Sequence, residues 1–374
     1  MEALGKISSF DLPGRPFFSI VIPCYNSKKT IGNLLQSIVD QNMKDEIEVI
    51  ISDDCSTEDY LDELLKFKDK VYMILTQTDY NFAPGNTREK GVQSATGEWL
   101  CFADHDDLYI KGTLLKVKRI LKTSGEKYLG IANFYESRLK DDGSIEILKT
   151  MIQSRNWNHA KFYNMDNLWK PYNIHFKKDL LTHEDIYVSS QVNGILAKIN
   201  GDKPLNIDLF CYHWICRPTT ISRQKYGNHN FLEVFFKDYL DSTGYAFLDL
   251  LKEDKVPINY AMDACIGVVL LSYIYVQSFL FEHPKDYYRE NLDYCTEYLI
   301  AVKETFGINN QFIYNYAAAN RAAVYETQRA SGLIATGFFL PNKTLIDWLD
   351  YLHHDIEVKH TMSDSIWKDD KIEN

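Results

Sequence analysis

The sequence has little of what marks several protein classes. Its seven cysteines are odd in number and scattered, and no two form a Cys-x-x-Cys pair. A disulfide framework and a zinc knuckle are therefore not expected, and a reduced compartment is favoured. Positive charge is scarce as well, with 41 Lys and Arg against 52 Asp and Glu and a net charge of −11. Long-range attraction to nucleic acid or to an acidic bilayer is not expected at this charge.

The sequence also lacks a run that could cross a membrane. Its longest apolar stretch, residues 266–281, contains serine, glutamine and tyrosine and falls short of the about 20 residues that span a bilayer. We expect a buried helix there. The opening residues, Met-Glu-Ala-Leu-Gly-Lys, lack the basic head and apolar core of a secretory signal. We therefore expect a cytoplasmic chain without a transmembrane segment, compatible with peripheral contact to a membrane.

What the sequence does contain is typical of a globular protein. Hydrophobic residues make up 45% of its 374 positions and charged residues 25%, which excludes disordered and collagen-like classes. At about 150 residues per domain, this length predicts two domains. The patterns below predict an N-terminal extension, an α/β domain, a helical domain and a charged tail, at residues 1–16, 17–226, 227–362 and 363–374.

The first third of the chain alternates between strand and helix patterns. Four apolar runs predict buried strands, at residues 18–22, 47–51, 71–75 and 99–103. Apolar residues at helical spacing predict crossover helices between them. Buried strands with helical crossovers are typical of an α/β fold with a doubly wound, mostly parallel sheet. Such sheets bind ligands beyond the carboxyl ends of their strands, where polar clusters follow in this sequence.

The rest of the chain is irregular at first and then helical. Residues 141–144 predict a hairpin turn, residues 183–198 a helix and residues 205–216 a strand. After about residue 227 the pattern is helical almost throughout, with tyrosine and phenylalanine on the apolar stripe. These aromatic residues either cover one another and the first domain or form the interface of a homo-oligomer.

The strongest chemical signal is an apolar strand that ends in Asp104-His105-Asp106-Asp107. Carboxylates at i and i+2 place two oxygen ligands near one point, which suits Mg²⁺ or Mn²⁺ with open positions for phosphate oxygens. Acids after a strand also serve as turn formers or helix caps. Taken alone, the pattern leaves both interpretations open.

Four linked segments give this pattern a context. They are Phe18–Asn26, Val49–Asp59, Asn81–Arg88 with Gly91, and Gly97–Asp107. In order and spacing they resemble the family-2 glycosyltransferases of the GT-A fold. The resemblance implies a mixed, mostly parallel sheet flanked by helices, a nucleotide half at 17–110, an acceptor half at 111–226, and a UDP-sugar donor.

The same resemblance implies roles for individual residues. Donor-binding candidates are Pro23, Tyr25, Asn26, Asp53, Asp54, Asn81, Arg88, Asp104 and His105. Asp54, or else Asp53, would hold the base and ribose, Arg88 would lie by the nucleotide, and Asp106 would coordinate the metal together with Asp104. Other roles remain open: Tyr25 as ordinary packing, Arg88 paired with Glu89, Ser56 with Asp59 as a capping box, and His105 as a spacer pointing away.

Two downstream segments extend the resemblance. Leu181–Val188 is similar to the helix start that supplies the general base, here Asp185 with Glu184 as second choice, and Thr182 with Asp185 could equally form a capping box. Tyr212–Arg223 is similar to the segment that follows it in the family. It implies that Arg217, Ser222 and Arg223 close over the diphosphate. His213 is a candidate third metal ligand, or else a packed strand histidine.

The function implied is an inverting, metal-dependent glycosyltransferase that transfers a sugar from a UDP-sugar to a glycan or cell-surface polymer, with teichoic acid favoured. The Gln-x-x-Arg-Trp motif of processive members is absent. One alternative is a non-catalytic module that binds a nucleotide or sugar and acts as an assembly surface. Protein and modified nucleic acid are alternative acceptors, nucleic acid being disfavoured by the charge. A nucleotidyltransferase is a third class, which the missing glycine-rich phosphate loop disfavours.

Overall fold

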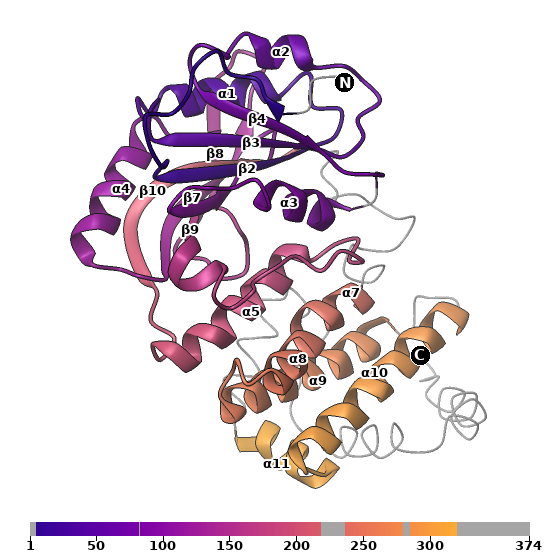
Figure 1. Cartoon of the computed structure of the whole chain (residues 1–374). Coiled ribbons are helices and arrows are strands. Elements are labelled where there is room, and N and C mark those ends of the chain that lie inside the picture. The colour runs from indigo at the N-terminus through magenta and orange to yellow at the C-terminus, as the bar shows by residue number, and fades with distance from the viewer. Residues whose placement is uncertain (1–4, 82, 218–235, 280–284, 320–374) are drawn as a thin grey trace. The chain divides into compact units, whose positions relative to one another are not determined.

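The computed structural model describes residues 5–81, 83–217, 236–279 and 285–319 (Figure 1). The chain forms two compact units, Met1–Phe231 and Leu232–Asn374. The first holds an α/β layer structure, and the described part of the second is helical.

A ten-stranded mixed sheet organises the first unit, in the order β1-β4-β3-β2-β5-β9-β7-β10-β6, with β8 paired to β7. Strands β2, β3, β4 and β5 run parallel, whereas β9 is antiparallel to both β5 and β7. The strand bounds are β1 Gly5–Lys6, β2 Phe18–Cys24, β3 Ile47–Asp53, β4 Tyr72–Gln77, β5 Trp99–Phe102, β6 Leu108–Tyr109, β7 Leu129–Leu139, β8 Ile145–Met151, β9 Lys161–Asn164 and β10 Leu205–Ile215.

Helices flank this sheet, and their bounds are α1 Ile31–Val39, α2 Leu61–Leu65, α3 Pro84–Val92, α4 Thr113–Ser124 and α5 Glu184–Ile199. Every residue of β3 is buried. Its alternate residues join a hydrophobic core with the apolar stripe of α1, which consists of Ile31, Leu34, Leu35 and Ile38. The four predicted strands and the α/β class are thus confirmed, because continuous apolar runs are what a sheet covered on both faces requires.

A close approach between β5 and β2 places the loop that follows β5. A Cβ atom on Gly97 would lie 2.5 Å from Ser19 Oγ and 2.8 Å from Ser19 N. The Gly97 amide donates to Ser19 Oγ at 2.8 Å and to the buried Glu48 carboxylate at 2.9 Å. Only glycine fits at this contact. The contact holds the start of β5 against β2, and so it sets the position of Asp104–Asp107, which follow β5.

Beyond β5 the sheet departs from a purely parallel pattern. The predicted turn at 141–144 joins β7 and β8 as an antiparallel hairpin, in which the Lys140 amide donates to the Ser144 carbonyl oxygen and Gly143 has φ +81°. The predicted strand at 205–216 is β10, which runs parallel to β7. The sequence did not predict β8 or β9: β8 is mostly exposed, and β9 has only four residues.

The second unit contains α7 Phe236–Leu240, a π-helical turn Asp241–Tyr245, α8 Ala246–Lys252, α9 Ile258–Phe279, α10 Lys285–Phe306 and α11 Asn310–Ala319. The predicted helical region is confirmed over these residues, and the apolar stretch from residue 266 to 279 lies in α9. Among the described residues, no helix is both long and apolar enough to cross a membrane. The homo-oligomer and the domain boundaries stay predictions.

Candidate functional site

The carboxyl ends of β2, β3 and β5 meet at one edge of the sheet. Cys24 and Asp53 are register partners at the ends of β2 and β3, and Val21 of β2 pairs with Phe102 at the end of β5. The segments after these strands therefore lie together, although more than 75 residues separate the first from the last. Parallel strands bring their carboxyl ends to the same edge, which is why the polar clusters converge.

The structure separates the roles of the neighbouring acids Asp53 and Asp54. The fully buried Asp53 carboxylate accepts hydrogen bonds from Ser56, Tyr60 Oη at 2.8 Å and Gln77 Nε2 at 2.8 Å. Asp54 Oδ1 accepts from Thr78 Oγ1 at 2.9 Å. Several protein donors thus surround Asp53, and they hold its carboxylate within the fold.

The capping box considered for α2 does not form. Its N-cap residue, Tyr60, makes no side-chain cap. Asp59 Oδ1 instead accepts from the Leu61 amide at 2.9 Å, and Ser56 Oγ donates to Asp53. Asn81 Nδ2 donates to the carbonyl oxygen of Asp54 at 3.0 Å and so braces that turn from α3's side of the loop.

Residues 23–26, at the end of β2 and in the loop after it, lie at the same edge of the sheet. Pro23 lies within β2, paired with Ser52. Asn26 has φ +49°, and its Oδ1 accepts from the amides of Thr57 and Glu58 at 2.9 and 3.1 Å. Asn26 thus joins the loop after β2 to the loop after β3. Tyr25 is 45% exposed, so its ring can stack on a ligand.

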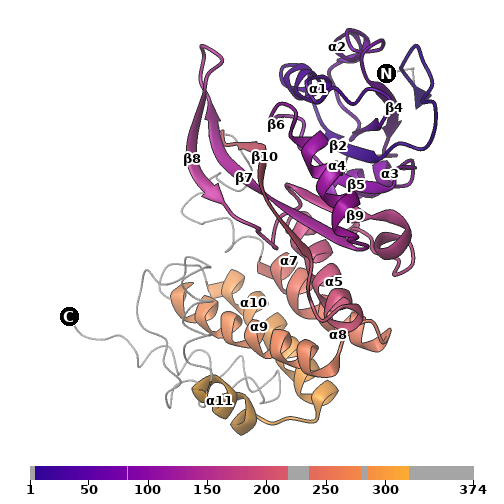
Figure 2. The ribbon, with the colours of Figure 1, turned by 90° about the vertical axis from the view of Figure 1, so that its left-hand side faces the viewer.

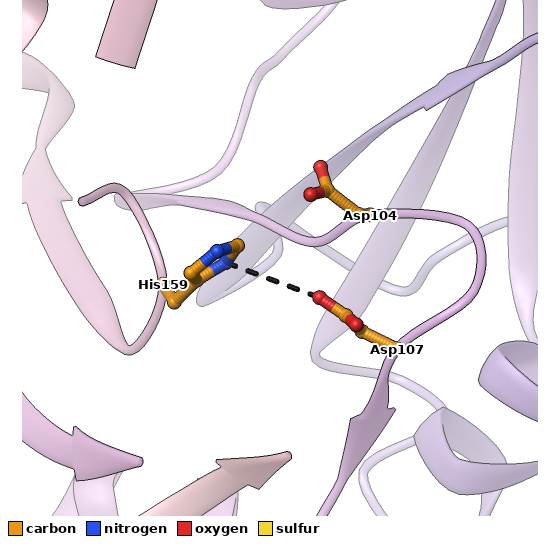
Figure 3. A group of neighbouring side chains, drawn as sticks. All are labelled: Asp104, Asp107 and His159. Carbon is orange, nitrogen blue, oxygen red and sulfur yellow. Dashed lines mark ion pairs between the residues drawn. The ribbon is translucent and has the colours of Figure 1, made fainter. Parts of the chain in front are cut away.

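Three side chains gather below the end of β5, Asp104, Asp107 and His159 (Figure 3). One ligand atom from each lies within 4.8 Å of the others, and His159 Nδ1 is 4.0 Å from Asp107 Oδ2. The sequence prediction missed His159, since it precedes β9 and no local pattern links it to residues 104–107. It lies flat against Tyr212, with ring centroids 5.4 Å apart and planes at 17°.

Asp107 ties the acidic loop to β10. It is fully buried, its Oδ2 accepts from Tyr212 Oη at 2.8 Å, and its Oδ1 accepts from the Ile215 amide at 2.7 Å. Tyr212 Oη in turn accepts from the Asp104 amide at 3.1 Å. These bonds engage both Asp107 oxygens, whereas the Asp104 and Asp106 side chains stay 31% and 26% exposed. Asp104 and Asp106 are therefore better placed than Asp107 to meet a cation.

Burial and charge set the protonation of this group. Burial, reinforced by Asp104 and Asp106, raises the pKa of Asp107 well above its usual range. Burial lowers the pKa of His159 to about 4, so its imidazole is neutral at pH 7. Burial, the largest single effect, works to raise the pKa of Asp104, but the charge of Arg88, its hydrogen bond and smaller contributions from His159 and His105 together lower the pKa below its usual value. Burial raises the pKa of Asp106.

Arg88 of α3 joins this group to α5. Its Nη2 donates to Asp104 Oδ1 at 2.6 Å and its Nη1 to Glu184 Oε1 at 2.5 Å. The side chain is only 9% exposed, and its buried Nε has no partner among the described residues. The pairing with Glu89 considered from the sequence does not occur, since the Glu89 carboxylate accepts from the Phe176 amide. The guanidinium therefore neutralises two acids that are 80 residues apart in the chain.

Glu184 and Asp185 begin α5 at the far side of Arg88. The residue before the helix is His183, with φ 60° and no side-chain cap. Thr182, the candidate for a capping box with Asp185, lies one residue before this position. Burial and the neighbouring Glu184 raise the pKa of Asp185 to about 7, against the opposing effect of Arg88. A carboxyl with this pKa can accept a proton near neutral pH.

Four further sequence candidates lie near or beyond this group. His105 Nδ1 is 2.8 Å from Thr30 Oγ1, so this residue faces the start of α1. Arg217 Nε lies 3.6 Å from Asp106 Oδ2, an ion pair that joins it to the acidic loop. Ser222 and Arg223 lie outside the described residues.

His213 is not brought into the acidic group. On β10, Tyr212 and Trp214 contact His159, and alternation along a strand turns His213 to the opposite face. There its Nδ1 lies 2.9 Å from Ser137 Oγ and its ring stacks on Tyr135. The packed strand histidine is the arrangement observed, and His159 is the imidazole that lies beside the acids.

Comparisons with known proteins find similar sequences among glycosyltransferases. The model of the family described as glycosyl transferase family 2 matches residues 19–179. TarS of Staphylococcus aureus, a poly(ribitol-phosphate) beta-N-acetylglucosaminyltransferase, is 39% identical over 99 residues, which cover 26% of this chain and 17% of TarS. A poly(ribitol-phosphate) beta-glucosyltransferase of Bacillus spizizenii is 39% identical over 101 residues, 26% of this chain and 16% of that protein.

The matched segment thus spans only about a sixth of the length of these relatives. Likeness in fold extends further. A crystal structure of S. aureus TarS 1-349 in complex with UDP-GlcNAc has a TM-score of 0.60 at 20% identity, covering 84% of this chain and 92% of that one. The GT-A fold implied by the sequence is therefore shown. Residues 19–179, which contain the edge at β2, β3 and β5, match the model of glycosyl transferase family 2.

Proposed function

We propose that this chain is an inverting glycosyltransferase that transfers a sugar from a UDP-sugar to a hydroxyl group of a cell-surface polymer. The observation that carries the proposal is the Arg88 bridge. Arg88 contacts both Asp104, which follows β5 on the nucleotide side, and Glu184, which begins α5. A transfer in line requires a donor site and a base on opposite sides of one reacting carbon, held at fixed distance.

The nucleotide site would be the edge formed by residues 23–26, Asp54 and Asn81. Tyr25 offers an exposed ring for stacking on the base, and Asp54 offers a carboxylate for the ribose hydroxyls. TarS, whose fold this chain shares, has been crystallised with UDP-GlcNAc, which supports a uridine-nucleotide donor here.

The residues present fit a divalent cation beside the diphosphate. Asp104 and Asp106, both partly exposed, supply hard oxygen ligands, and the neutral His159 offers a ligand atom within 4.8 Å of one on Asp104. When bound, Mg²⁺ or Mn²⁺ would neutralise charge on the departing diphosphate. Arg217, paired with Asp106, would add positive charge on the same side.

Asp185 would act as the general base. Its carboxylate would take the proton of the acceptor hydroxyl as that oxygen forms a bond to the anomeric carbon, and the bond from this carbon to UDP breaks with the electron pair leaving on the diphosphate. Glu184, held by Arg88, would keep the first turn of α5 in place for this step.

A pair of variants tests the division of roles. Asp106→Asn should abolish transfer and weaken Mn²⁺-dependent UDP binding, measured by calorimetry, because it removes a cation ligand. Asp185→Asn should abolish transfer, by about 10³-fold or more, and leave UDP binding unchanged. Equal UDP binding by both variants would contradict the roles assigned, and sustained transfer by Asp185→Asn would contradict the base.

The acceptor proposed is a polyol-phosphate polymer of the teichoic acid type, supported by the two poly(ribitol-phosphate) glycosyltransferases among the relatives. The test is UDP release from UDP-GlcNAc and UDP-glucose, with Mn²⁺, in the presence of poly(ribitol phosphate). Release that rises with the polymer supports this acceptor. Donor hydrolysis that the polymer does not change would support a glycosyltransferase with another acceptor, and no release from any UDP-sugar would favour a non-catalytic module.

A further inference from the structure

The β7–β8 hairpin leaves a sheet edge open. Figure 2 shows β8 on the outer side of β7, and among the described strands β7 is its one partner. Five of the seven β8 side chains are exposed, on both faces of the strand. They include Ile145, Ile147 at 51% exposure and Leu148, and the exposed Ile152 follows directly. A long apolar edge strand is a template for pairing with another strand, and most proteins avoid one.

The register within the hairpin gives this edge an unusual charge pattern. Glu146 pairs with Arg138 and Lys149 pairs with Glu136, and a register shift between them makes Leu148 the extra residue of a β-bulge. Arg138 and Glu136 are two apart on β7 and so share a face. Glu146 and Lys149, three apart, therefore lie on one face of β8, where a regular strand would put them on opposite faces. By the same register, Ile145 and Thr150 share the other face.

This pattern is complementary to itself. If two copies of β8 run antiparallel about an axis between Ile147 and Leu148, Glu146 of each lies opposite Lys149 of the other. Ile145 then lies opposite Thr150, and Ile147 opposite Leu148. If the two-fold axis passed through Glu146, the two copies of Glu146 would oppose like charges. If it passed through Ile147, Glu146 would lie opposite Leu148. Only the register with the axis between Ile147 and Leu148 therefore pairs Glu146 with Lys149. The bulge puts these two residues on the same face of the strand, so the pair can form.

We propose that β8 is an interface between two copies of this chain, which pair through their β8 edges across a two-fold axis. Such an interface is isologous, as closed dimers are, and it uses main-chain hydrogen bonds for affinity and the charged pairs for register. A bulge twists an edge and limits how far pairing extends. A contact between two seven-residue strands is also small compared with stable interfaces, which bury about 1,200 Å² or more. We therefore expect the fraction of dimer to depend on protein concentration.

Charge reversal tests the register. In sedimentation velocity over a concentration series, the unchanged chain should form a dimer. Glu146→Lys and Lys149→Glu should each raise its dissociation constant by about tenfold, because each opposes like charges twice, and the double variant should restore it. Asp141→Lys and Lys140→Glu, in the adjoining turn, are controls with the same net charge changes. A chain that stays monomeric, or a dimer that ignores the single reversals, would overturn the proposal.

A crosslink tests the same register independently of affinity. Directly opposed residues have Cα atoms about 4.5–5.5 Å apart, within reach of a disulfide. In a Cys55→Ser background, which removes the one cysteine that is not buried, Ile145→Cys with Thr150→Cys should give a crosslinked dimer on oxidation. Either cysteine alone should give none. A crosslink from a single cysteine, or none from the pair, would contradict the axis between Ile147 and Leu148.

Discussion

Two regions of the first unit contribute to the candidate site in different ways. The parallel core, β2 to β5 with α1 to α3, consists of buried strands whose site residues follow each strand directly. The outer layer, β7 to β10 with α5, contains half-exposed strands and aromatic stacks, and its contributions are His159, Tyr212, Glu184 and Asp185. The core places ligand-binding groups by local chain geometry. The outer layer places groups by long-range packing against the core.

Arg88→Met should have the largest effect, because this residue connects the two regions. Its removal leaves the Glu184 and Asp104 carboxylates without their cation, which in a buried setting costs about 3–5 kcal/mol, less here since Asp104 is partly exposed. We expect loss of transfer and a lower free energy of unfolding in urea. Arg88→Lys retains the charge but cannot bridge both acids and should be intermediate. Unchanged stability of Arg88→Met would show that the bridge is not a joint between the regions.

Gly97→Ala should damage the parallel core and spare the outer layer. The new methyl group meets the backbone of Ser19, and overpacking of this kind costs about 1–3 kcal/mol. The free energy of unfolding, measured in urea, should fall by that amount. Gly143→Ala, in the exposed β7–β8 turn where φ is +81° and nothing lies near, is a control for backbone strain without a clash. If both variants lose the same stability, the clash at β5 is not the cause.

The pH dependence of transfer should report on the outer layer through Asp185. Its pKa of about 7 means that the base is protonated in acid, so kcat should fall about tenfold per pH unit below 7. The free energy of unfolding changes with pH in the opposite direction to kcat. The raised pKa of Asp185 means that its protonation stabilises the folded state. The contribution of Asp185 to stability is present below about pH 4 and decreases up to about pH 7. Stability curves of Asp185→Asn should lack this decrease; an identical curve would refute the assigned pKa.

Tyr212→Phe should have the smallest effect and lies where the two regions meet. It removes the hydrogen bond to Asp107 and the acceptor for the Asp104 amide, at a cost of about 1–3 kcal/mol for groups left buried without a partner. Cation-dependent UDP binding should weaken, because the acidic loop loses its tie to β10. Tyr109→Phe, which keeps the edge-to-face ring contact with Tyr212, is a matched control. Equal UDP binding by both variants would exclude a positioning role for Tyr212.

The success of sequence prediction follows the same division. The strands of the core could be predicted, because a buried parallel strand appears in the sequence as a continuous apolar run. The convergence of Asp54, Asp104 and Asp106 followed, because parallel strands end at the same edge of the sheet. The hydrogen bonds that enclose Asp53 could not be predicted, since they come from Tyr60 and Gln77, which lie elsewhere in the chain. The imidazole near the acids could not be predicted either. The sequence left His213 open as a metal ligand or a packed strand histidine, and the structure places it against Ser137, away from His159.

The amino-acid sequence by itself determined the α/β class, the four strands of the core and the identity of the acids that follow them. These depend on interactions between residues close in the chain, which periodicity records. Only the tertiary structure decided that His159 lies beside Asp107, that Arg88 joins Asp104 to Glu184, and that a bulge brings Glu146 and Lys149 to one face. Each of these depends on the register or packing of distant segments, which no local pattern encodes.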